Sequence, residues 1–193
     1  MVCLAGVANT EAELDRQCTF IDEANQCIMN YTETCATDLQ QQLGNLLFDG
    51  AKKMKENYCT KGSELRKLYM KHAPCLRTAL RDAQRPCIKD LQVAFEAMTA
   101  AKWDKRGTIG CCAFNRVGDC LSKPIKKQCG QETIDFVGNM TTVLLSRLPG
   151  LLCGDLGIES ETCKTLLPPI GSEPKGGKTT SILNRLLSAY TSL

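Results

Sequence analysis

Residues 111–153 read CCAFNRVGDCLSKPIKKQCGQETIDFVGNMTTVLLSRLPGLLC, and the cysteines in this stretch indicate the class of fold. Cys111, Cys120, Cys129 and Cys153, counted as first to fourth, follow the spacing C-x8-C-x8-C-x23-C, and Cys112 stands as an extra cysteine beside the first. An earlier stretch, residues 18–59, has nearly the same spacing, C-x8-C-x7-C-x23-C. A Gly-Asn pair also stands nine residues after the third cysteine of each stretch, at Gly44-Asn45 and Gly138-Asn139. We therefore expect two similar halves, each held together by cystine.

The chain has 13 cysteines in 193 residues, no C-x-x-C pair and a single histidine. Zinc and iron–sulfur sites lack their usual ligand spacing here, so no metal and no cofactor is expected. Cysteine this frequent indicates disulfides formed in an oxidising compartment. Six disulfides are expected among Cys18, Cys27, Cys35, Cys59, Cys75, Cys87, Cys111, Cys112, Cys120, Cys129, Cys153 and Cys163.

The odd cysteine is Cys3, which lies in an uncharged apolar run that ends in the small-x-small pattern Gly6-Val7-Ala8. Signal peptidase favours such an ending, so residues 1–8 are interpreted as the remainder of a secretory signal peptide. Two glycosylation sequons, at Asn30 and Asn139, agree with export. The sequence therefore predicts a secreted, extracellular glycoprotein.

Apolar residues recur at helical intervals, and the alternation typical of strands is nearly absent. Thr10 to Glu13 form a capping box that should start the first helix. A third helix is expected to end before Pro74, and Pro86 suits the first turn of a fourth. These signals predict an all-α, disulfide-stapled helical bundle. The expected parts are residues 1–8 (signal remainder), 9–104 and 105–168 (the two halves), 169–181 (linker) and 182–193 (amphipathic helix).

Helix geometry restricts which cysteines can pair. Cys18 and Cys27 are nine residues apart, about 13.5 Å along a continuous helix. Bridged cysteines need Cα atoms within about 7 Å, so these two should bind different neighbours. The same applies to Cys111 and Cys120, and the adjacent Cys111 and Cys112 should reach two separate partners.

The last segment differs from the rest. A Gly/Pro/Lys-rich linker that should not pack leads into an amphipathic helix. Residues 1–60 carry nine acidic residues against four basic ones, although the net charge of the whole chain is only +3. The helix is expected to dock on its own chain, to bind a second copy or a protein partner, or to lie on a membrane surface. Its apolar stripe consists of Ile182, Leu183, Leu186, Leu187 and Tyr190.

No catalytic residues are predicted. His72 has Ser63 as a conceivable partner, but a lone histidine on the apolar face of a helix is usually packed. Cys111-Cys112 resembles the double cysteine of secreted phospholipases A2, but position 115 is Asn where that family has its catalytic histidine. The low net charge argues against nucleic acid as a partner, and no apolar stretch is long enough to span a membrane.

With its sequons, helical pattern and widely spaced cysteines, the chain resembles the secreted cysteine-rich glycoproteins of arthropods, such as insect haemolymph glycoproteins. The resemblance extends over residues 10–165 and brings no functional residues with it. Insect odorant-binding proteins are also helical and disulfide-stapled, but their C-x3-C hallmark is absent.

The function expected from the sequence is extracellular, non-enzymatic binding or assembly. One alternative is a carrier of a small apolar ligand in body fluid, which calls for an enclosed apolar cavity. Another is a structural component of a secreted material such as silk, cement or cuticle, which calls for exposed apolar patches and self-association.

Overall fold

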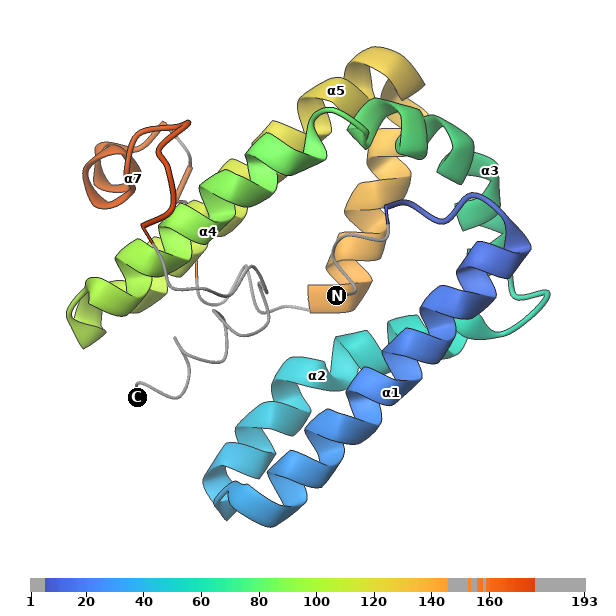
Figure 1. Ribbon diagram of the computed structural model, residues 1–193, viewed down its shortest axis with the longest axis horizontal. Coiled ribbons are helices and arrows are strands. Elements are labelled where there is room, and N and C mark those ends of the chain that lie inside the picture. The colour runs from blue at the N-terminus through green and yellow to red at the C-terminus, as the bar shows by residue number, and fades with distance from the viewer. Residues whose placement is uncertain (1–5, 146–152, 154–155, 158, 176–193) are drawn as a thin grey trace. The chain divides into compact units, whose positions relative to one another are not determined.

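A computed structural model describes residues 6–145, 153, 156–157 and 159–175, except for the side chains at 39, 40, 43 and 46–48. This part of the chain contains helices and no strand, which confirms the all-α prediction (Figure 1). Its helices are α1 (Glu11–Cys35), α2 (Asp38–Cys59), α3 (Glu64–Leu80), α4 (Gln84–Ala100), α5 (Trp103–Leu145) and α7 (Glu161–Leu166).

The chain forms two compact units that do not coincide with the two predicted halves. One unit comprises Val2–Thr78 and Cys129–Leu148 and is here called the α1–α3 unit. The other comprises Ala79–Gln128 and Pro149–Leu193 and is called the α4–α7 unit. The halves predicted at 9–104 and 105–168 are therefore wrong as structural units. The reason is α5, whose long course places its first part in one unit and its last part in the other.

In the α1–α3 unit, α1 and α2 run antiparallel and side by side (Figure 1). The predicted cap is confirmed, because the Thr10 hydroxyl accepts a hydrogen bond from the Glu13 amide at 3.2 Å. The N-terminal segment is packed as well: Ala8 is buried and its carbonyl accepts a bond from the Tyr69 hydroxyl at 2.9 Å. A Cβ at Gly50 would collide with the carbonyls of Val143 and Leu144. Glycine at this position thus lets the backbone of α2 approach that of α5.

Helix α3 continues through Pro74, contrary to the predicted end before it. Proline disfavours the helical conformation of the residue before it and removes one backbone donor. Here Ala73 and Leu76 are buried on either side of Pro74, and Cys75 is bonded to Cys129. Packing and the disulfide hold the helix across the proline, which itself faces solvent.

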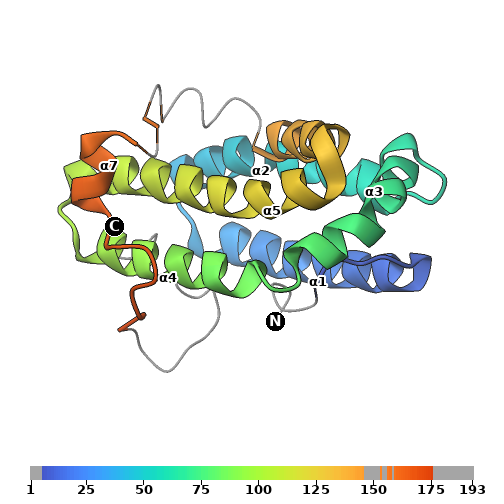
Figure 2. The same ribbon diagram turned by 90° about the horizontal axis from the view of Figure 1, so that it is seen from above.

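In the α4–α7 unit, α4 packs against the first part of α5, as Figure 2 shows from above. α7 covers the same cluster, and Pro86 occupies the first turn of α4 as predicted. The core contains two cysteines bonded to each other among small and branched apolar residues, namely Ala94, Ile109, Cys112, Ala113, Cys163 and Leu167. None of these residues is aromatic, and both cysteines of the disulfide are buried in the cluster.

Within α5, Gly130 interrupts the helical backbone with φ 79° and ψ −178°. This conformation strongly favours glycine, so the position is a built-in kink. The following segment carries Asn139, which is exposed.

Ten of the twelve expected cysteines form disulfides: Cys18–Cys59, Cys75–Cys129, Cys87–Cys120, Cys111–Cys153 and Cys112–Cys163. The predicted separation of Cys18 from Cys27, of Cys111 from Cys120, and of the partners of Cys111 and Cys112 is confirmed. The prediction of six bridges within one chain is wrong. Cys27 and Cys35 are free and exposed, and eight residues on one helix place them about 12 Å apart along its axis.

The segment after α7 also departs from expectation. The Gly171 amide donates to an Asp90 carboxylate oxygen at 2.8 Å, and the Lys175 amide donates to Glu96 at 2.8 Å. Lys89 forms an ion pair with Glu173. Residues 169–175 therefore lie along α4, because carboxylates on that helix accept hydrogen bonds from their backbone amides. The rest of the predicted linker and the helix at 182–193 lie outside the described residues.

Candidate functional site

The only histidine is used for packing, as the sequence predicts. His72 is buried, its Nδ1 lies 3.0 Å from the Thr133 hydroxyl oxygen, and its ring stacks on Phe136 with centroids 4.7 Å apart. Ser63 instead accepts a hydrogen bond from the Arg66 amide at 3.1 Å, which is the role of a residue that starts a helix. These two residues therefore have separate structural partners.

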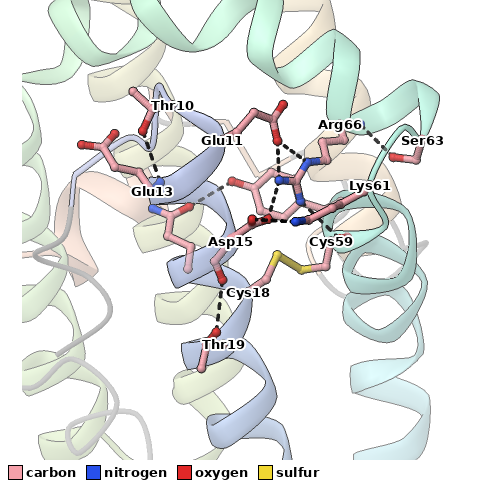
Figure 3. Close-up of polar contacts among 12 residues, drawn as sticks. Thr10, Glu11, Glu13, Asp15, Cys18, Thr19, Cys59, Lys61, Ser63 and Arg66 are labelled. Carbon is pink, nitrogen blue, oxygen red and sulfur yellow. Dashed lines mark hydrogen bonds and ion pairs between the residues drawn. A yellow bond between two sulfur atoms is a disulfide. The ribbon is translucent and has the colours of Figure 1, made fainter.

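A buried arginine that the sequence analysis missed joins α1 to α3 (Figure 3). The Arg66 side chain is 2% exposed, its Nε lies 2.8 Å from Glu11, and its Nη2 lies 2.5 Å from Asp15. Nη1 donates to the Cys59 carbonyl at 3.2 Å, beside the Cys18–Cys59 disulfide. Two carboxylates and a carbonyl occupy the guanidinium, so this cluster holds the helices together and offers no ligand site.

The ionisation of this cluster follows its contacts. Hydrogen bonds from Arg66 and then Lys61 lower the pKa of Asp15. Burial lowers the pKa of Arg66, but its bonds to Asp15 and Glu11 outweigh that effect and leave the pKa raised. The pKa of Glu13 is also lowered, first by the Asn9 amide and then by Arg77. The α1–α3 junction is thus held in its charged form.

A groove in the α4–α7 unit is the best candidate for binding. It has a volume of about 1030 Å³, is partly open to solvent and lies between α4, α5 and the segment around α7. The Cys112–Cys163 disulfide, Leu166 and Leu167 supply apolar surface, whereas Asp119, Lys123, Glu159 and Lys164 supply charges. We call it the Arg116 groove. Its remaining lining residues are Asp90, Arg116, Cys120, Thr165, Pro168, Pro169 and Ile170.

Arg116 gives this groove its chemical character. Its Nη1 donates to the Pro168 carbonyl at 2.7 Å. Its Nη2 is buried and has no hydrogen-bond partner. Burial lowers the pKa of the guanidinium, an effect that the charge of Asp90 opposes. A buried donor without an acceptor costs about 1–3 kcal/mol, so a ligand oxygen placed here would recover that energy.

Asp90 faces the same groove but is already engaged. It is buried, and its carboxylate accepts the Gly171 amide. The groove therefore combines apolar walls, a charged rim and one unsatisfied cationic donor. Such a site suits an amphipathic molecule with an apolar body and an anionic head.

The sequence carried a signal for Arg116. It stands four residues after Cys112 and four before Cys120, so helical geometry places all three on one side of α5. An arginine between two bonded cysteines on one helical face was a candidate for burial. Leu166 and Leu167 form the apolar wall of the groove. Only the tertiary structure shows that they lie near Arg116.

The other predicted sites are placed as follows. Both sequon residues, Asn30 and Asn139, are exposed. No cluster of metal-ligating side chains occurs among the described residues. No described helix is both long and apolar enough to cross a membrane. The stripe Ile182, Leu183, Leu186, Leu187 and Tyr190 is outside the described residues.

Comparison with protein-family models, curated proteins and solved structures gives no match for this chain.

Proposed function

We propose that this protein is a secreted, non-enzymatic glycoprotein of an extracellular fluid that binds a small amphipathic ligand in the Arg116 groove. The observation that carries the proposal is the buried, unpartnered Nη2 of Arg116 in an otherwise largely apolar groove. Five disulfides support an oxidising compartment. The exposed sequons at Asn30 and Asn139 support glycosylation.

The groove resembles a carrier site in composition but not in closure. A carrier of a small apolar ligand was expected to have an enclosed cavity, whereas the Arg116 groove is partly open. An open groove suits a ligand whose head contacts Arg116 while its chain lies over the Cys112–Cys163 disulfide and Leu167. The ligand class is therefore a long-chain carboxylate or a similar anion.

The test uses the fluorescent probe 11-(dansylamino)undecanoic acid, which has an apolar body and a carboxylate, and its methyl ester. The full-length secreted protein should bind the acid more tightly than the ester. A hydrogen bond to a charged group is worth about 1.5–3 kcal/mol, so Arg116→Gln should weaken binding of the acid by about tenfold or more. Lys126→Gln, which removes an exposed charge on the same helix away from the groove, is the matched control.

Equal binding of acid and ester, or equal loss in the two variants, would overturn the proposal. Circular dichroism of both variants establishes that Arg116→Gln remains folded.

A second function, as a component of a secreted material, is favoured by exposed apolar side chains. Trp103 is 67% exposed beside the Arg106 guanidinium, 5.9 Å from the ring centroid, and Ile170 is 76% exposed. Concentration-dependent self-association measured by sedimentation tests this function. A protein that stays monomeric at high concentration would contradict it.

A further inference from the structure

The outward face of α1 carries two thiols in a disulfide-rich protein. Cys27 and Cys35 are free and exposed, whereas every other described cysteine is in a disulfide. They cannot bond to each other, because eight residues of helix separate them by about 12 Å along its axis. Cys3, outside the described residues and in the expected signal remainder, has one thiol and could satisfy only one of them. Oxidation of both thiols to disulfides therefore requires at least one partner from another molecule.

The two thiols share their face with exposed aromatic residues. Tyr31 lies four residues from each cysteine, and four residues advance about 40° beyond a full helical turn. Cys27, Tyr31 and Cys35 thus span an arc of about 80° with Tyr31 at its centre. Phe20, eleven residues earlier, falls within the same arc. Phe20 is 40% and Tyr31 54% exposed, whereas the buried Leu14 and Cys18 point elsewhere. We call Phe20, Cys27, Tyr31 and Cys35 the outer face of α1.

The internal repeat shows what cysteines at these positions do. In both stretches the first cysteine bonds the fourth: Cys18 to Cys59, and Cys111 to Cys153. The inner cysteines of the second stretch, Cys120 and Cys129, bond outward to Cys87 and Cys75 on other helices. Cys27 and Cys35 are their counterparts by spacing. By analogy with Cys120 and Cys129, Cys27 and Cys35 stand at positions from which a cysteine bonds to a cysteine of another helix.

The outer face of α1 is complementary to itself. A two-fold symmetric interface requires that residue i contacts j and that j contacts i. When two α1 helices run antiparallel about a two-fold axis at Tyr31, Cys27 of each copy lies level with Cys35 of the other. Symmetry then positions the second bond once the first has formed. Glu33 falls level with Met29 of the other copy, and Glu23 lies beyond the end of the other copy's α1 at Cys35, so the pairing of the two helices brings no acidic pair of α1 face to face.

The sequon at Asn30 is compatible with this arrangement. One residue of helix turns the side chain by about 100°, so a glycan on Asn30 leaves the helix well away from the direction of Tyr31. It would flank the outer face without covering it.

We propose that the outer face of α1 binds the same face of a second copy and that two reciprocal Cys27–Cys35 disulfides close this interface. Four thiols become two interchain disulfides by exchange with two molecules of an external disulfide such as oxidised glutathione. Four electrons and four protons pass to that oxidant, which leaves as four thiols. The inference is independent of the Arg116 groove.

The experiment compares the full-length secreted protein with Cys27→Ser and Cys35→Ser by non-reducing electrophoresis and intact mass. The parent protein should be a covalent dimer. Each single variant should lose the covalent dimer, because its remaining cysteine faces serine in the partner. Co-expression of the two variants, carrying different tags, should restore a covalent dimer made only of one chain of each kind.

Tyr31→Ala should reduce the dimer fraction, whereas Met29→Ala should not, because Met29 is 46% exposed about 160° away on the same helix. A covalent dimer retained by both single variants would show like-with-like pairing and overturn the reciprocal arrangement. Monomers with free, glutathione-capped or Cys3-bonded cysteines, or a bond to a different protein, would overturn the second-copy proposal.

Discussion

Residues 18–59 and 111–153 have almost the same cysteine spacing, yet their inner cysteines have different fates. In both stretches a disulfide, here called the outer staple, joins the first cysteine to the fourth. In the second stretch the inner cysteines bond to Cys87 and Cys75, and in the first they stay exposed. The comparison shows that the same spacing is accompanied by the same disulfide between the outer cysteines of each stretch. An inner cysteine forms a disulfide within the chain, here called an inner staple, only where another helix brings a second cysteine next to it.

Removing an inner staple of the second stretch should have the largest effect on stability. A disulfide stabilises by about 2–4 kcal/mol, so Cys75→Ser with Cys129→Ser should lower the free energy of unfolding by that amount. In the Cys27→Ser variant, which lacks the proposed interchain bonds, adding Cys35→Ser should change it by less than about 0.5 kcal/mol, as exposed substitutions usually do. Chemical denaturation followed by helical circular dichroism measures both. Equal losses would contradict the free, exposed position of Cys35 in the structure.

Two glycines of the first stretch sharpen the comparison further. Gly50→Ala should destabilise by about 1–3 kcal/mol, because its Cβ meets backbone carbonyls of α5 that cannot move aside. Gly44→Ala meets nothing within 4 Å and lies in the middle of α2, so it should stabilise by about 0.5–1 kcal/mol. Thermal unfolding of the two variants is the measurement. A neutral Gly50→Ala would contradict the close approach of α2 and α5.

Acid should lower the free energy of unfolding by protonating Asp15, which lies close to the Cys18–Cys59 disulfide at the start of the first stretch. The pKa of Asp15 is lowered below its ordinary 3.8 by Arg66 and Lys61, so its contribution is complete above that value. It is lost as the pH falls through the lower, folded-state pKa. Arg66→Gln should therefore destabilise most at neutral pH, and its difference from the parent protein should shrink towards pH 3. Lys52→Gln, which removes an exposed charge on α2, is the control. A difference independent of pH would contradict this assignment.

The smallest effect is expected at the sequons, one in each stretch. Asn30→Gln and Asn139→Gln should each lower the mass of the secreted protein by one glycan. Since both residues are exposed, each should change stability by less than about 0.5 kcal/mol. Intact-mass spectrometry before and after glycan removal provides the measurement. An unmodified residue at either position would contradict glycosylation there.

Local signals predicted much of this fold. The Thr10 cap, the Pro86 first turn and the separate partners of Cys111 and Cys112 all follow from helix geometry. Errors arose where tertiary contacts override local preference. α3 passes through Pro74 because burial and a disulfide hold it, and residues 169–175 lie along α4 because Asp90 and Glu96 accept their amides.

The candidate site was less accessible to sequence analysis. Arg116 belongs to α5, but its carbonyl partner, Pro168, and the apolar wall at Leu167 come from a segment about fifty residues later. The buried Arg66 likewise depends on Glu11 and Asp15, more than fifty residues earlier. The spacing of residues along the chain does not predict contacts between segments about fifty residues apart.

The most direct test of the shared outer staple is a disulfide map of the secreted protein by non-reducing proteolysis and mass spectrometry. Fragmentation between the adjacent Cys111 and Cys112 is needed to assign their partners. The structure predicts peptides linking Cys18 to Cys59 and Cys111 to Cys153, so that first joins fourth in both stretches. A peptide that joins Cys18 or Cys111 to any other cysteine would contradict this account of the fold.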